Sequence, residues 1–301
     1  MNILLLGANG QVGHALRSAL SPLGEVVATT RSATLDDGNV CEIADFDRPE
    51  TLPALIARLA PQAVVNAAAY TAVDRAETDR DAAFRANADA PAAIAQACAA
   101  AGIPLIHYST DYVFDGSGTR PYREDDATSP LGVYGESKRA GEEAIDASGA
   151  RHAILRTAWV YAAHGKNFMR TMLRLAAERD ELRVVADQIG SPTSADLIAE
   201  TTVAVLRAMI DDPQRSFGTR HLTASEQTSW HGFATAIVER AHAQGRLARR
   251  PAVTAIATAD YPTPARRPAY SVLDCGLLQS ELGLRLPRWS DDLDRVIAQL
   301  R

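Results

Sequence analysis

A glycine-rich turn lies almost at the start of the chain. The apolar run Ile3–Leu6 is followed directly by Gly7-Ala-Asn-Gly-Gln-Val-Gly13, and a helical pattern comes next. Gly7 permits a tight turn, Gly10 lets the backbone approach a pyrophosphate, and Gly13 lets the helix pack closely on the strand. The N–H groups at a helix start also attract phosphate. Three glycines also fit an ordinary turn, but their position directly after the first strand favours dinucleotide binding.

Short apolar runs alternate with helix-length segments through the first half of the chain. We expect strands over residues 3–6, 25–30, 63–66, 105–108 and 153–156, and helices over 12–20, 51–59, 81–101 and 134–147. Strands that are apolar throughout are typical of parallel sheets buried on both faces, and helix-length connections suit right-handed crossovers. The pattern therefore predicts an α/β fold with a doubly wound, Rossmann-type parallel sheet.

The pattern becomes less regular after about residue 160. We expect helices over 167–179, 195–209 and 230–243, short strands over 184–185, 221–223 and 253–256, and a helical tail. Ligands of doubly wound folds bind at the carboxyl ends of the strands. We therefore expect a dinucleotide-binding domain over 1–160, which the chain re-enters around 190–225, and a smaller, discontinuous C-terminal substrate lobe within 161–301.

Charge and hydropathy argue against two classes of partner. The formal net charge of −6 disfavours nucleic acid, because phosphates select a basic face. No apolar run approaches the ~18 residues that a membrane span needs, and the apolar start lacks the basic leader of a signal peptide. Three scattered cysteines, Cys41, Cys98 and Cys275, fit a reducing compartment. We expect a cytoplasmic protein without nucleic-acid or membrane partners.

The residues after the second predicted strand bear on the choice of cofactor. An acidic residue there favours NAD, whereas a basic one accepts the 2′-phosphate of NADP. This chain has Thr30-Arg31-Ser32, and its first carboxylate comes only at Asp36. The sequence favours NADPH, with NADH as an alternative donor, unless Arg31 is an ordinary surface charge. Asp45 and Phe46 follow a segment that could form another strand, and they could flank an adenine.

A phenol and an ammonium lie at the start of one predicted helix. Tyr134 and Lys138 are four positions apart and therefore share a helix face. Reducing a ketone requires a hydride and a proton, and a fixed cation lowers the pKa of a phenol from about 10. Upstream, Ser109 and Thr110 end the fourth strand, where a hydroxyl can donate to a carbonyl oxygen. We expect Tyr134 to donate the proton and Lys138 to lower the pKa of Tyr134. We expect Thr110, or else Ser109, to polarise the carbonyl.

With these motifs the chain resembles the dTDP-4-dehydrorhamnose reductases, a family of extended short-chain dehydrogenases. The resemblance covers nearly the whole chain, and its most specific segments are 65–74 (VNAAAYTAVD) and 109–114 (STDYVF). The other matching segments are 7–13, 45–46, Glu77, 87–91 (NADAP), 115–116, 130–138 (PLGVYGESK), 155–161 (LRTAWVY), 187–193 (DQIGSPT) and 267–274 (RPAYSVLD).

The resemblance implies reduction of the 4-keto group of dTDP-4-dehydro-L-rhamnose to give dTDP-L-rhamnose for cell-surface polysaccharide. It places Asp111, Tyr112 and Trp159 at the sugar, and Arg267 and Ser271 at the diphosphate of this dTDP-keto-sugar. The cofactor ligands that it implies besides the three glycines are Asn9, Gln11, Val12, Asp45, Phe46, Ala67, Ala68, Ala69, Tyr70, Tyr134 and Lys138. Without the family, Trp159 fits a core aromatic equally well. Mg²⁺ is implied by the resemblance alone, because the chain has no dense carboxylate or histidine cluster.

The chain differs from the family pattern at one position, and two alternative functions stay open. The family usually has Asn where this chain has Tyr270, so a substrate contact there is in doubt. Another extended-type sugar-nucleotide enzyme, such as an epimerase, a dehydratase or a different 4-keto-reductase, fits the same motifs. A non-catalytic regulatory subunit that binds a dinucleotide is the second alternative, and the intact Thr110, Tyr134 and Lys138 argue against it. A homodimer also stays open as the assembly.

Overall fold

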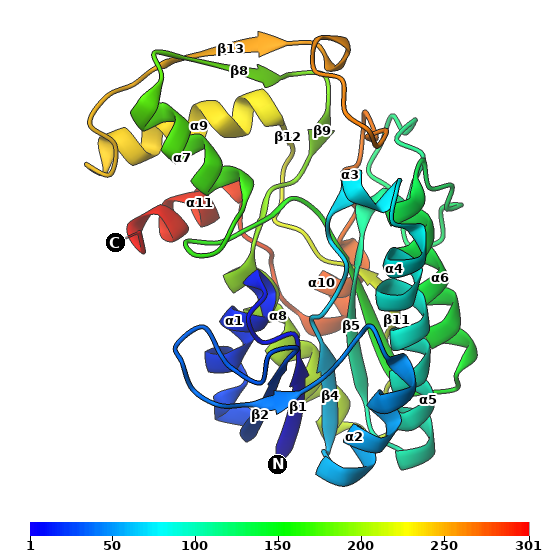
Figure 1. Cartoon of the computed structure of the whole chain (residues 1–301). Coiled ribbons are helices and arrows are strands. Elements are labelled where there is room, and N and C mark those ends of the chain that lie inside the picture. Colours follow the sequence, from blue (N-terminus) through cyan, green and yellow to red (C-terminus); the bar gives the residue numbers. More distant parts are fainter. Residues whose placement is uncertain (301) are drawn as a thin grey trace.

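Seven parallel strands form the central sheet in a computed structural model, which describes residues 1–300. The strands are β1 (Asn2–Leu6), β2 (Glu25–Thr30), β3 (Glu42–Ile43), β4 (Ala63–Asn66), β5 (Leu105–Thr110), β6 (His152–Thr157) and β11 (Gly218–His221). Their order is β11-β6-β5-β4-β1-β2-β3, so the chain winds outward in both directions from the centre (Figure 1). The predicted doubly wound α/β fold is confirmed.

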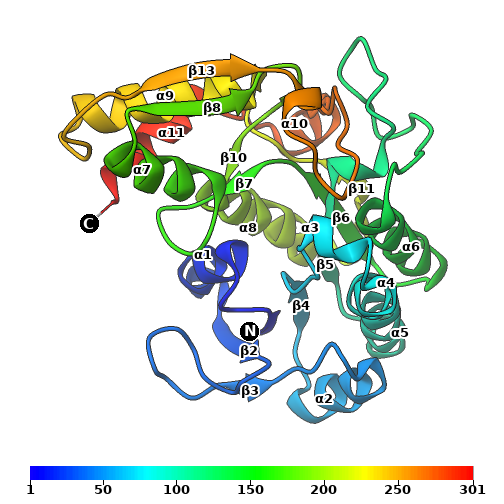
Figure 2. The ribbon, with the colours of Figure 1, turned by 45° about the horizontal axis from the view of Figure 1, so that its top comes forward.

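Alternate residues of the strands pack against helices on opposite faces. The helices that cover the sheet are α1 (Gln11–Ala19), α2 (Leu52–Leu59), α5 (Ala90–Ala101), α6 (Val133–Ala147) and α8 (Ala195–Asp211). Ile3 and Leu5 share one buried cluster with α1 and α8, whereas Leu4 and Leu6 share another with α2 and α5. The two layers of helices lie on either side of the sheet in Figure 2. Each fully buried side chain of this kind contributes about 1.5–3 kcal/mol.

The predicted helix over 81–101 is not continuous. It consists of α4 (Arg80–Phe84), a π-helical turn η3 (Arg85–Asp89) and α5. Pro91 lies in the first turn of α5 and has no N–H to bond back to the carbonyl of Asn87, so a regular α-helix cannot pass through this point. A Cβ on Gly141 of α6 would lie 2.0 Å from that same carbonyl oxygen. The π turn therefore lies directly against α6.

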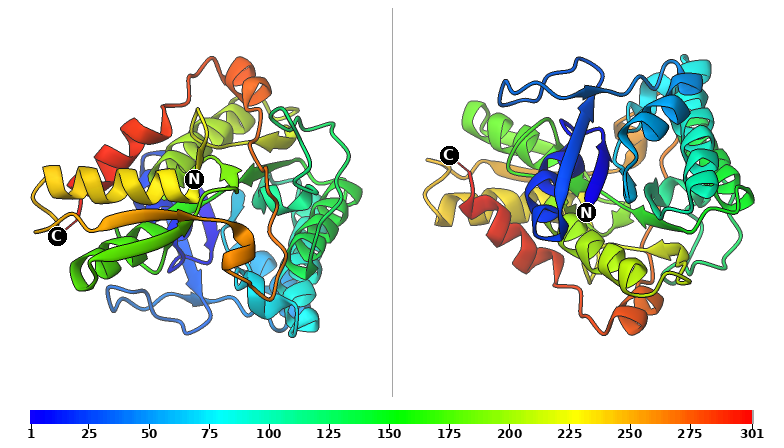
Figure 3. Two further views of the ribbon diagram at one scale, coloured as in Figure 1. Left: turned by 90° about the horizontal axis from the view of Figure 1, so that it is seen from above. Right: turned by 90° about the horizontal axis from the view of Figure 1, so that it is seen from below.

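A second group of elements lies above the carboxyl edge of the sheet (Figures 1 and 3). It comprises α7 (Phe168–Glu178), α9 (Trp230–Ala243), α11 (Trp289–Ala298), and the parallel pair β8 (Glu181–Val185) and β13 (Ala252–Ile256). Tyr161, Met169, Phe233 and Leu293 are buried together in its own apolar cluster. Two short pairs lie beneath it, β7 (Val160–Tyr161) with β10 (Thr193–Ser194), and β9 (Ile189–Gly190) with β12 (Thr228–Ser229).

The chain returns to the first sheet between these upper elements. Helix α8 packs on α1, and β11 pairs with β6 over 218–221 rather than forming a strand over 221–223. The remaining short elements are η1 (Ser21–Leu23), η2 (Pro49–Thr51), α3 (Val73–Ala76), η4 (Asp111–Val113), η5 (Thr258–Asp260) and α10 (Gly276–Leu282). No helix within residues 1–300 combines the length and apolar character needed to cross a membrane.

Candidate active site

The glycine-rich turn between β1 and α1 is packed too tightly for larger side chains. A Cβ on Gly7, whose φ is +81°, would lie 2.6 Å from the backbone nitrogen of Ala68, and a Cβ on Gly13 would lie 2.1 Å from the Gly7 oxygen. Helix α1 begins at Gln11 without a side-chain cap, so no side chain occupies the N–H groups of its first turn. The buried Gln11 Oε1 has no hydrogen-bond partner among the described residues. These features fit the diphosphate of a dinucleotide.

Two predicted cofactor ligands lie near the loop that follows β2. The Asn9 side chain holds this loop, because its Nδ2 donates to the Thr34 carbonyl at 2.9 Å and its Oδ1 accepts from the Asp36 nitrogen at 3.0 Å. Arg31 extends from the end of β2 with 78 % of its side chain exposed, and its Nη1 lies 3.3 Å from Asp47. A dinucleotide role for either residue stays a prediction.

The other residues predicted around the nucleotide lie on neighbouring elements. Asp45 and Phe46 follow β3, the additional strand that the sequence suggested. Arg48 donates to Asp45 at 2.9 Å and thereby holds the pKa of this carboxyl below its ordinary value. Phe46 packs against the α2–α5 cluster, and Val12 packs against the α1–α8 cluster.

The loop over Ala67–Tyr70 is held between the glycine turn and α6. The Ala67 nitrogen donates to the Leu6 carbonyl at 2.9 Å. At the other end, Asn87 accepts from the Tyr70 nitrogen at 2.8 Å, donates to the Tyr70 carbonyl at 3.0 Å, and donates to Ser137 Oγ at 3.0 Å. Asn87 is fully buried in the π turn. The sequence marks Asn87 only as part of the family match, although an asparagine, a poor helix former, within an Ala-rich helical segment is a signal of such a contact.

The start of α6 is fixed by contacts from two other segments. Its first residue, Val133, donates its N–H to Glu77 Oε1 at 3.0 Å, and a carboxylate at a helix N-terminus is favourable. A Cβ on Gly135 would lie 2.2 Å from the Tyr112 carbonyl oxygen, so α6 lies directly against η4. Glu77 therefore caps the helix that carries Tyr134, a role that the sequence did not reveal.

The structure brings Thr110 and Tyr134 together, as the sequence predicted. The buried Thr110 hydroxyl donates to Asp111 Oδ1 at 3.0 Å and accepts from the Tyr112 nitrogen at 3.2 Å. It also lies close enough to the Tyr134 phenol to lower the pKa of that group. The Tyr112 ring meets the Tyr134 ring edge-on, with centroids 5.6 Å apart. Ser109, the alternative polariser, precedes Thr110 and therefore points to the opposite face of β5. Of the two hydroxyls, Thr110 is the one beside the phenol.

The pKa of Tyr134 differs in direction from the sequence expectation. Burial raises this pKa to about 12, and the hydrogen bond with Thr110 opposes the rise. Lys138 does not lower it here, because its Nζ donates to the Tyr108 carbonyl at 2.6 Å and lies 3.2 Å from His107 Nε2. That Lys138 lowers the pKa of Tyr134 during the reaction stays a prediction. The phenol is fully protonated at neutral pH, the state that a proton donor requires.

Asp111 is a buried carboxyl beside Thr110. Burial raises its pKa to about 6, against the opposing hydrogen bonds from Ser271 and Thr110. Because the folded protein binds this proton more tightly than the unfolded chain, stability from this group is full below about pH 4 and is lost as the pH rises through about 6.

We expect Asp111→Asn to raise the free energy of unfolding at pH 8 by about 2–3 kcal/mol, the equivalent of two pKa units, and to leave it nearly unchanged at pH 4. Urea unfolding at both pH values measures this effect. Asp126→Asn is the control of opposite sign, since Arg120 lowers the pKa of Asp126 to about 2. If Asp111→Asn raises the free energy of unfolding equally at both pH values, the charge of Asp111 is not the cause of the rise.

The predicted sugar and diphosphate residues lie where the upper elements meet the sheet. Trp159 follows β6 with a φ of +49°, and its ring stacks on Trp230 at 3.5 Å between centroids. Arg267 forms a two-pronged ion pair with Asp74, with both N–O distances at 2.9 Å. Ser271 is buried beside Asp111. Because Asp74 already engages Arg267, a diphosphate role for this arginine stays a prediction.

Tyr270, which stands where the resembling family usually has Asn, points to another loop. Its hydroxyl donates to Gln227 Oε1 at 3.1 Å, and its ring lies 6.4 Å from that of Tyr122. Within residues 1–300, no group of three or more histidine, cysteine, aspartate or glutamate side chains forms a metal site. The described residues therefore do not fit the Mg²⁺ that the resemblance implied.

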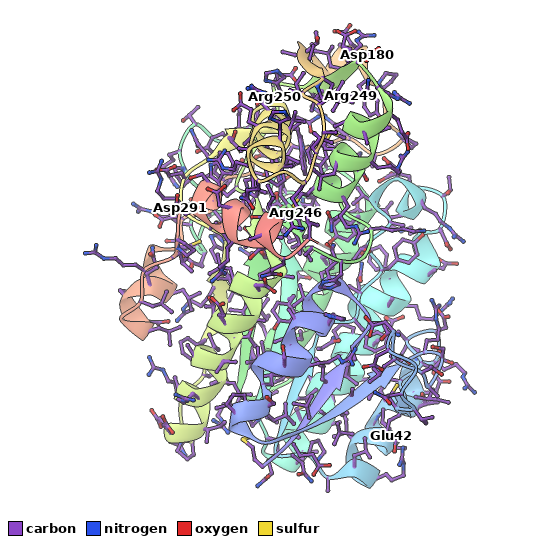
Figure 4. The ribbon with its side chains drawn as sticks, turned by 90° about the vertical axis from the view of Figure 1, so that its left-hand side faces the viewer. Glu42, Asp180, Arg246, Arg249, Arg250 and Asp291 are labelled. Carbon is purple, nitrogen blue, oxygen red and sulfur yellow. The ribbon has the colours of Figure 1, made fainter. Side chains whose placement is uncertain are left out.

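A basic cluster lies at the end of the upper elements, far from the glycine turn. Arg249 and Arg250 are labelled there at the top of Figure 4, whereas Arg246 is labelled lower, near α11, where it donates to the Ala298 carbonyl at 3.1 Å. Arg249 pairs with Asp180 at 2.6 Å and Arg250 pairs with Glu239 at 2.8 Å. This cluster is therefore largely neutralised by its own neighbours.

Comparisons with known sequences agree along the full chain. The family model described as the RmlD substrate binding domain matches residues 1–301. The chain is 45% identical to the dTDP-4-dehydrorhamnose reductase of Escherichia coli K12, covering 100% of this chain and 98% of that one. It is 47% identical to the reductase of the same name from Burkholderia thailandensis, covering 96% and 95%.

Solved structures give the same result. The dTDP-4-dehydrorhamnose reductase of Clostridium acetobutylicum superposes with a TM-score of 0.86 at 35% identity, covering 99% of both chains. The reductase of Bacillus anthracis, solved in complex with NADP, superposes with a TM-score of 0.86 at 31% identity, again over 99% of both chains. The chain belongs to the dTDP-4-dehydrorhamnose reductase family.

Proposed function

We propose that this protein reduces the 4-keto group of dTDP-4-dehydro-L-rhamnose to give dTDP-L-rhamnose, with NADPH as the hydride donor. The observation that carries the proposal is the placement of Thr110 beside Tyr134 at the carboxyl edge of the sheet whose first strand leads into the glycine turn. The full-length similarity to enzymes named for this reaction supports the choice of sugar. The chain is thus an oxidoreductase that acts on a nucleotide sugar in dTDP-rhamnose biosynthesis.

Proton delivery is the step that the residues of this chain perform. A bound NADPH supplies the hydride for C4 of the sugar. Tyr134 donates its phenolic proton to the C4 oxygen, and Thr110 donates a hydrogen bond to the same oxygen as it gains negative charge. One ketone, one hydride and one proton give one alcohol, and solvent later returns the proton to Tyr134.

The other predicted residues bind and orient the reactants. Asp111, Tyr112 and Trp159 surround the sugar, and Ser271 with Arg267 serves its diphosphate. The upper elements act as the substrate lobe, which follows the division into 1–160 and 161–301 with re-entry at 190–225. The burial of Asp111 and the stacking of Trp159 on Trp230 support fixed positions for these two side chains.

The choice of NADPH rests on Arg31, which is exposed at the end of β2 and paired only with Asp47 at 3.3 Å. We expect Arg31→Ala to weaken NADPH binding about 10-fold, because a charged hydrogen bond to phosphate contributes about 1.5–3 kcal/mol. NADH binding should change less than about 2-fold, since NADH lacks the 2′-phosphate. Calorimetric titration with both cofactors measures the two effects.

The matched control is Arg58→Ala, which removes the same charge from the nearby Arg58–Glu42 pair. The N–O distance of this pair is 2.6 Å, and Glu42 is labelled at the lower edge of the molecule in Figure 4. This control should leave both affinities unchanged. Equal losses of affinity for NADPH and NADH in Arg31→Ala would show that Arg31 does not bind the 2′-phosphate.

A stoichiometric assay tests the proposed reaction. With dTDP-4-dehydro-L-rhamnose supplied, the absorbance of NADPH should fall by one equivalent for each sugar reduced. If the sugar changes configuration while the cofactor shows no net oxidation, the protein is an epimerase and the proposal fails. If neither the sugar nor the cofactor changes, the alternative of a non-catalytic subunit that binds a dinucleotide is supported.

A further inference from the structure

An ion pair joins the segment that follows β4 to the segment that precedes α10. Asp74 lies in α3, and Arg267 lies 193 residues later, between η5 and α10. The later segment passes beside α3 in Figure 1. Nη1 of Arg267 donates to Asp74 Oδ1 and Nη2 donates to Oδ2, both at 2.9 Å. The carboxylate therefore contacts the outer end of the guanidinium.

Two donors of Arg267 stay unused. A guanidinium carries five N–H groups in one plane, one on Nε and two on each Nη. Asp74 accepts one from each Nη, and the Ala265 carbonyl at 2.9 Å and Thr263 Oγ1 at 3.2 Å accept from Nη1 as well. The Nε–H and the second N–H of Nη2 have no acceptor within residues 1–300. These two bonds run parallel, because Nη2 lies on the same side as the Nε–H.

The unused edge of Arg267 has the shape that a phosphate group requires. Two parallel N–H bonds in one plane can donate to two oxygens of the same phosphate. The Arg267 side chain is 22 % exposed, and its Nε is not among the buried polar atoms that lack a partner. A ligand can therefore reach this edge while Asp74 stays bonded to the other one.

The backbone around Arg267 is fixed from two sides. The Ile189 nitrogen of β9 donates to the Ala269 carbonyl at 2.8 Å, and the Tyr270 nitrogen donates to the Gly116 carbonyl at 3.1 Å. These bonds hold the chain but leave the long arginine side chain free to rotate. The direction of its guanidinium is set by the contacts that the guanidinium itself makes.

Both members of the pair are charged at neutral pH. The hydrogen bond from Arg267 holds the pKa of Asp74 below its ordinary value. Although burial opposes the change, the hydrogen bond with Asp74 holds the pKa of Arg267 above its ordinary value. The guanidinium also lies close enough to Tyr112 for the two groups to affect each other, and the Tyr112 ring meets Tyr134 edge-on. Arg267 is thus held near the proposed catalytic pair.

We propose that Asp74 is a positioning residue, which holds Arg267 with its Nε–Nη2 edge toward the diphosphate of the sugar nucleotide. The inference deepens the proposed function and rests on it, because Arg267 is the residue proposed to bind this diphosphate. Asp74 stays bonded to Arg267 when the ligand binds. The arginine then loses little freedom on binding, since its side chain is already oriented.

A crystal structure of the full chain with dTDP tests this arrangement in the unaltered protein. We expect two oxygens of one phosphate to lie about 3 Å from Nε and Nη2 of Arg267, with both bonds to Asp74 intact. A phosphate that displaces Asp74, or one that does not contact Arg267, would overturn the proposal. Because dTDP carries no keto-sugar, failure of the proposed reduction would be seen separately, in the stoichiometric assay.

Asp74→Asn tests the positioning role in solution, by calorimetric titration with dTDP. Asparagine keeps one acceptor, but its NH₂ group cannot accept from the second Nη of Arg267. We expect the affinity for dTDP to fall at least about 5-fold, within the range of coupling between residues in contact. An unchanged affinity would overturn the proposal. So would a higher one, which would show that Asp74 competes with the diphosphate for Arg267.

A second variant, Arg267→Met, separates positioning from a general structural role. Alone it should lower the affinity for dTDP at least about 10-fold, because a charge-assisted contact is lost. If Asp74 acts through Arg267, adding Asp74→Asn should cause no further loss. Losses that multiply in the double variant would assign Asp74 a structural role and overturn the proposal, as would an Arg267→Met protein that binds dTDP normally.

Glu281→Gln is the matched control. Glu281 of α10 forms a two-pronged pair with Arg220 of β11, with N–O distances of 2.8 and 2.7 Å. Its loss should leave the affinity for dTDP unchanged, because this pair lies outside the proposed diphosphate site. If Asp74→Asn does not fold, the crystal structure of the unaltered protein with dTDP still decides.

Discussion

Tyr134→Phe should lower kcat/KM for the dTDP-keto-sugar by at least about 100-fold, the lower end of the contribution of general acid catalysis. The change removes the only proton donor that we place at the C4 oxygen. It leaves the ring and its edge-on contact with Tyr112 in place. Affinity for NADPH should stay within about 2-fold of the original, because the hydroxyl is not part of the glycine turn. Steady-state kinetics and calorimetric titration measure the two effects.

Tyr161→Phe is the matched control for this prediction. Tyr161 is fully buried, its hydroxyl has no hydrogen-bond partner within residues 1–300, and it lies in the cluster of the upper elements. Removing that hydroxyl should leave turnover unchanged and stability equal or higher, since an unpaired buried polar group costs free energy. If the Tyr134→Phe enzyme is as active as the Tyr161→Phe enzyme, Tyr134 is not the proton donor.

Arg156→Met should lower the free energy of unfolding by about 3–5 kcal/mol, the usual cost of leaving a buried charge without its partner. Arg156 of β6 donates twice to Glu142 of α6, at 2.8 and 2.7 Å, and the two side chains are 3 % and 0 % exposed. Arg139 keeps one contact with Glu142, so the loss should lie toward the lower end of this range. Urea unfolding measures it.

Two further variants separate the charge from the packing. Replacing both partners, as in Glu142→Met with Arg156→Met, should restore most of the lost stability, because no unpaired charge stays buried. Arg174→Met is the exposed control, since its pair with Glu178 of the same helix contributes less than about 1 kcal/mol. If Arg156→Met costs no more than Arg174→Met, the buried pair does not hold α6 on the sheet.

Much of the sheet could be predicted from the sequence because its strands are continuous apolar runs. The strands over 25–30 and 63–66 agree to the residue with β2 and β4, and the helix over 230–243 agrees with α9. The spacing of Tyr134 and Lys138 likewise placed both side chains on α6. In each case the residues that determine the element are neighbours in the sequence, so a local pattern is sufficient to predict it.

The partners of these side chains could not be predicted, because they come from distant segments. Lys138 contacts His107, which lies 31 residues earlier, and Arg267 contacts Asp74, which lies 193 residues earlier. The break at 85–89 depends on Pro91 and on the approach of Gly141, again from another helix. His107 and Asn66 were the available signals, since a polar side chain inside a buried strand requires a partner.

Transfer of a labelled hydride is the most direct measurement of the central claim. The protein is incubated with dTDP-4-dehydro-L-rhamnose and NADPH that carries two deuterium atoms at nicotinamide C4. We expect dTDP-L-rhamnose with one deuterium on C4 of the sugar, together with one equivalent of oxidised cofactor. A sugar product without deuterium at C4, or one formed without net oxidation of the cofactor, would contradict hydride delivery to this carbon.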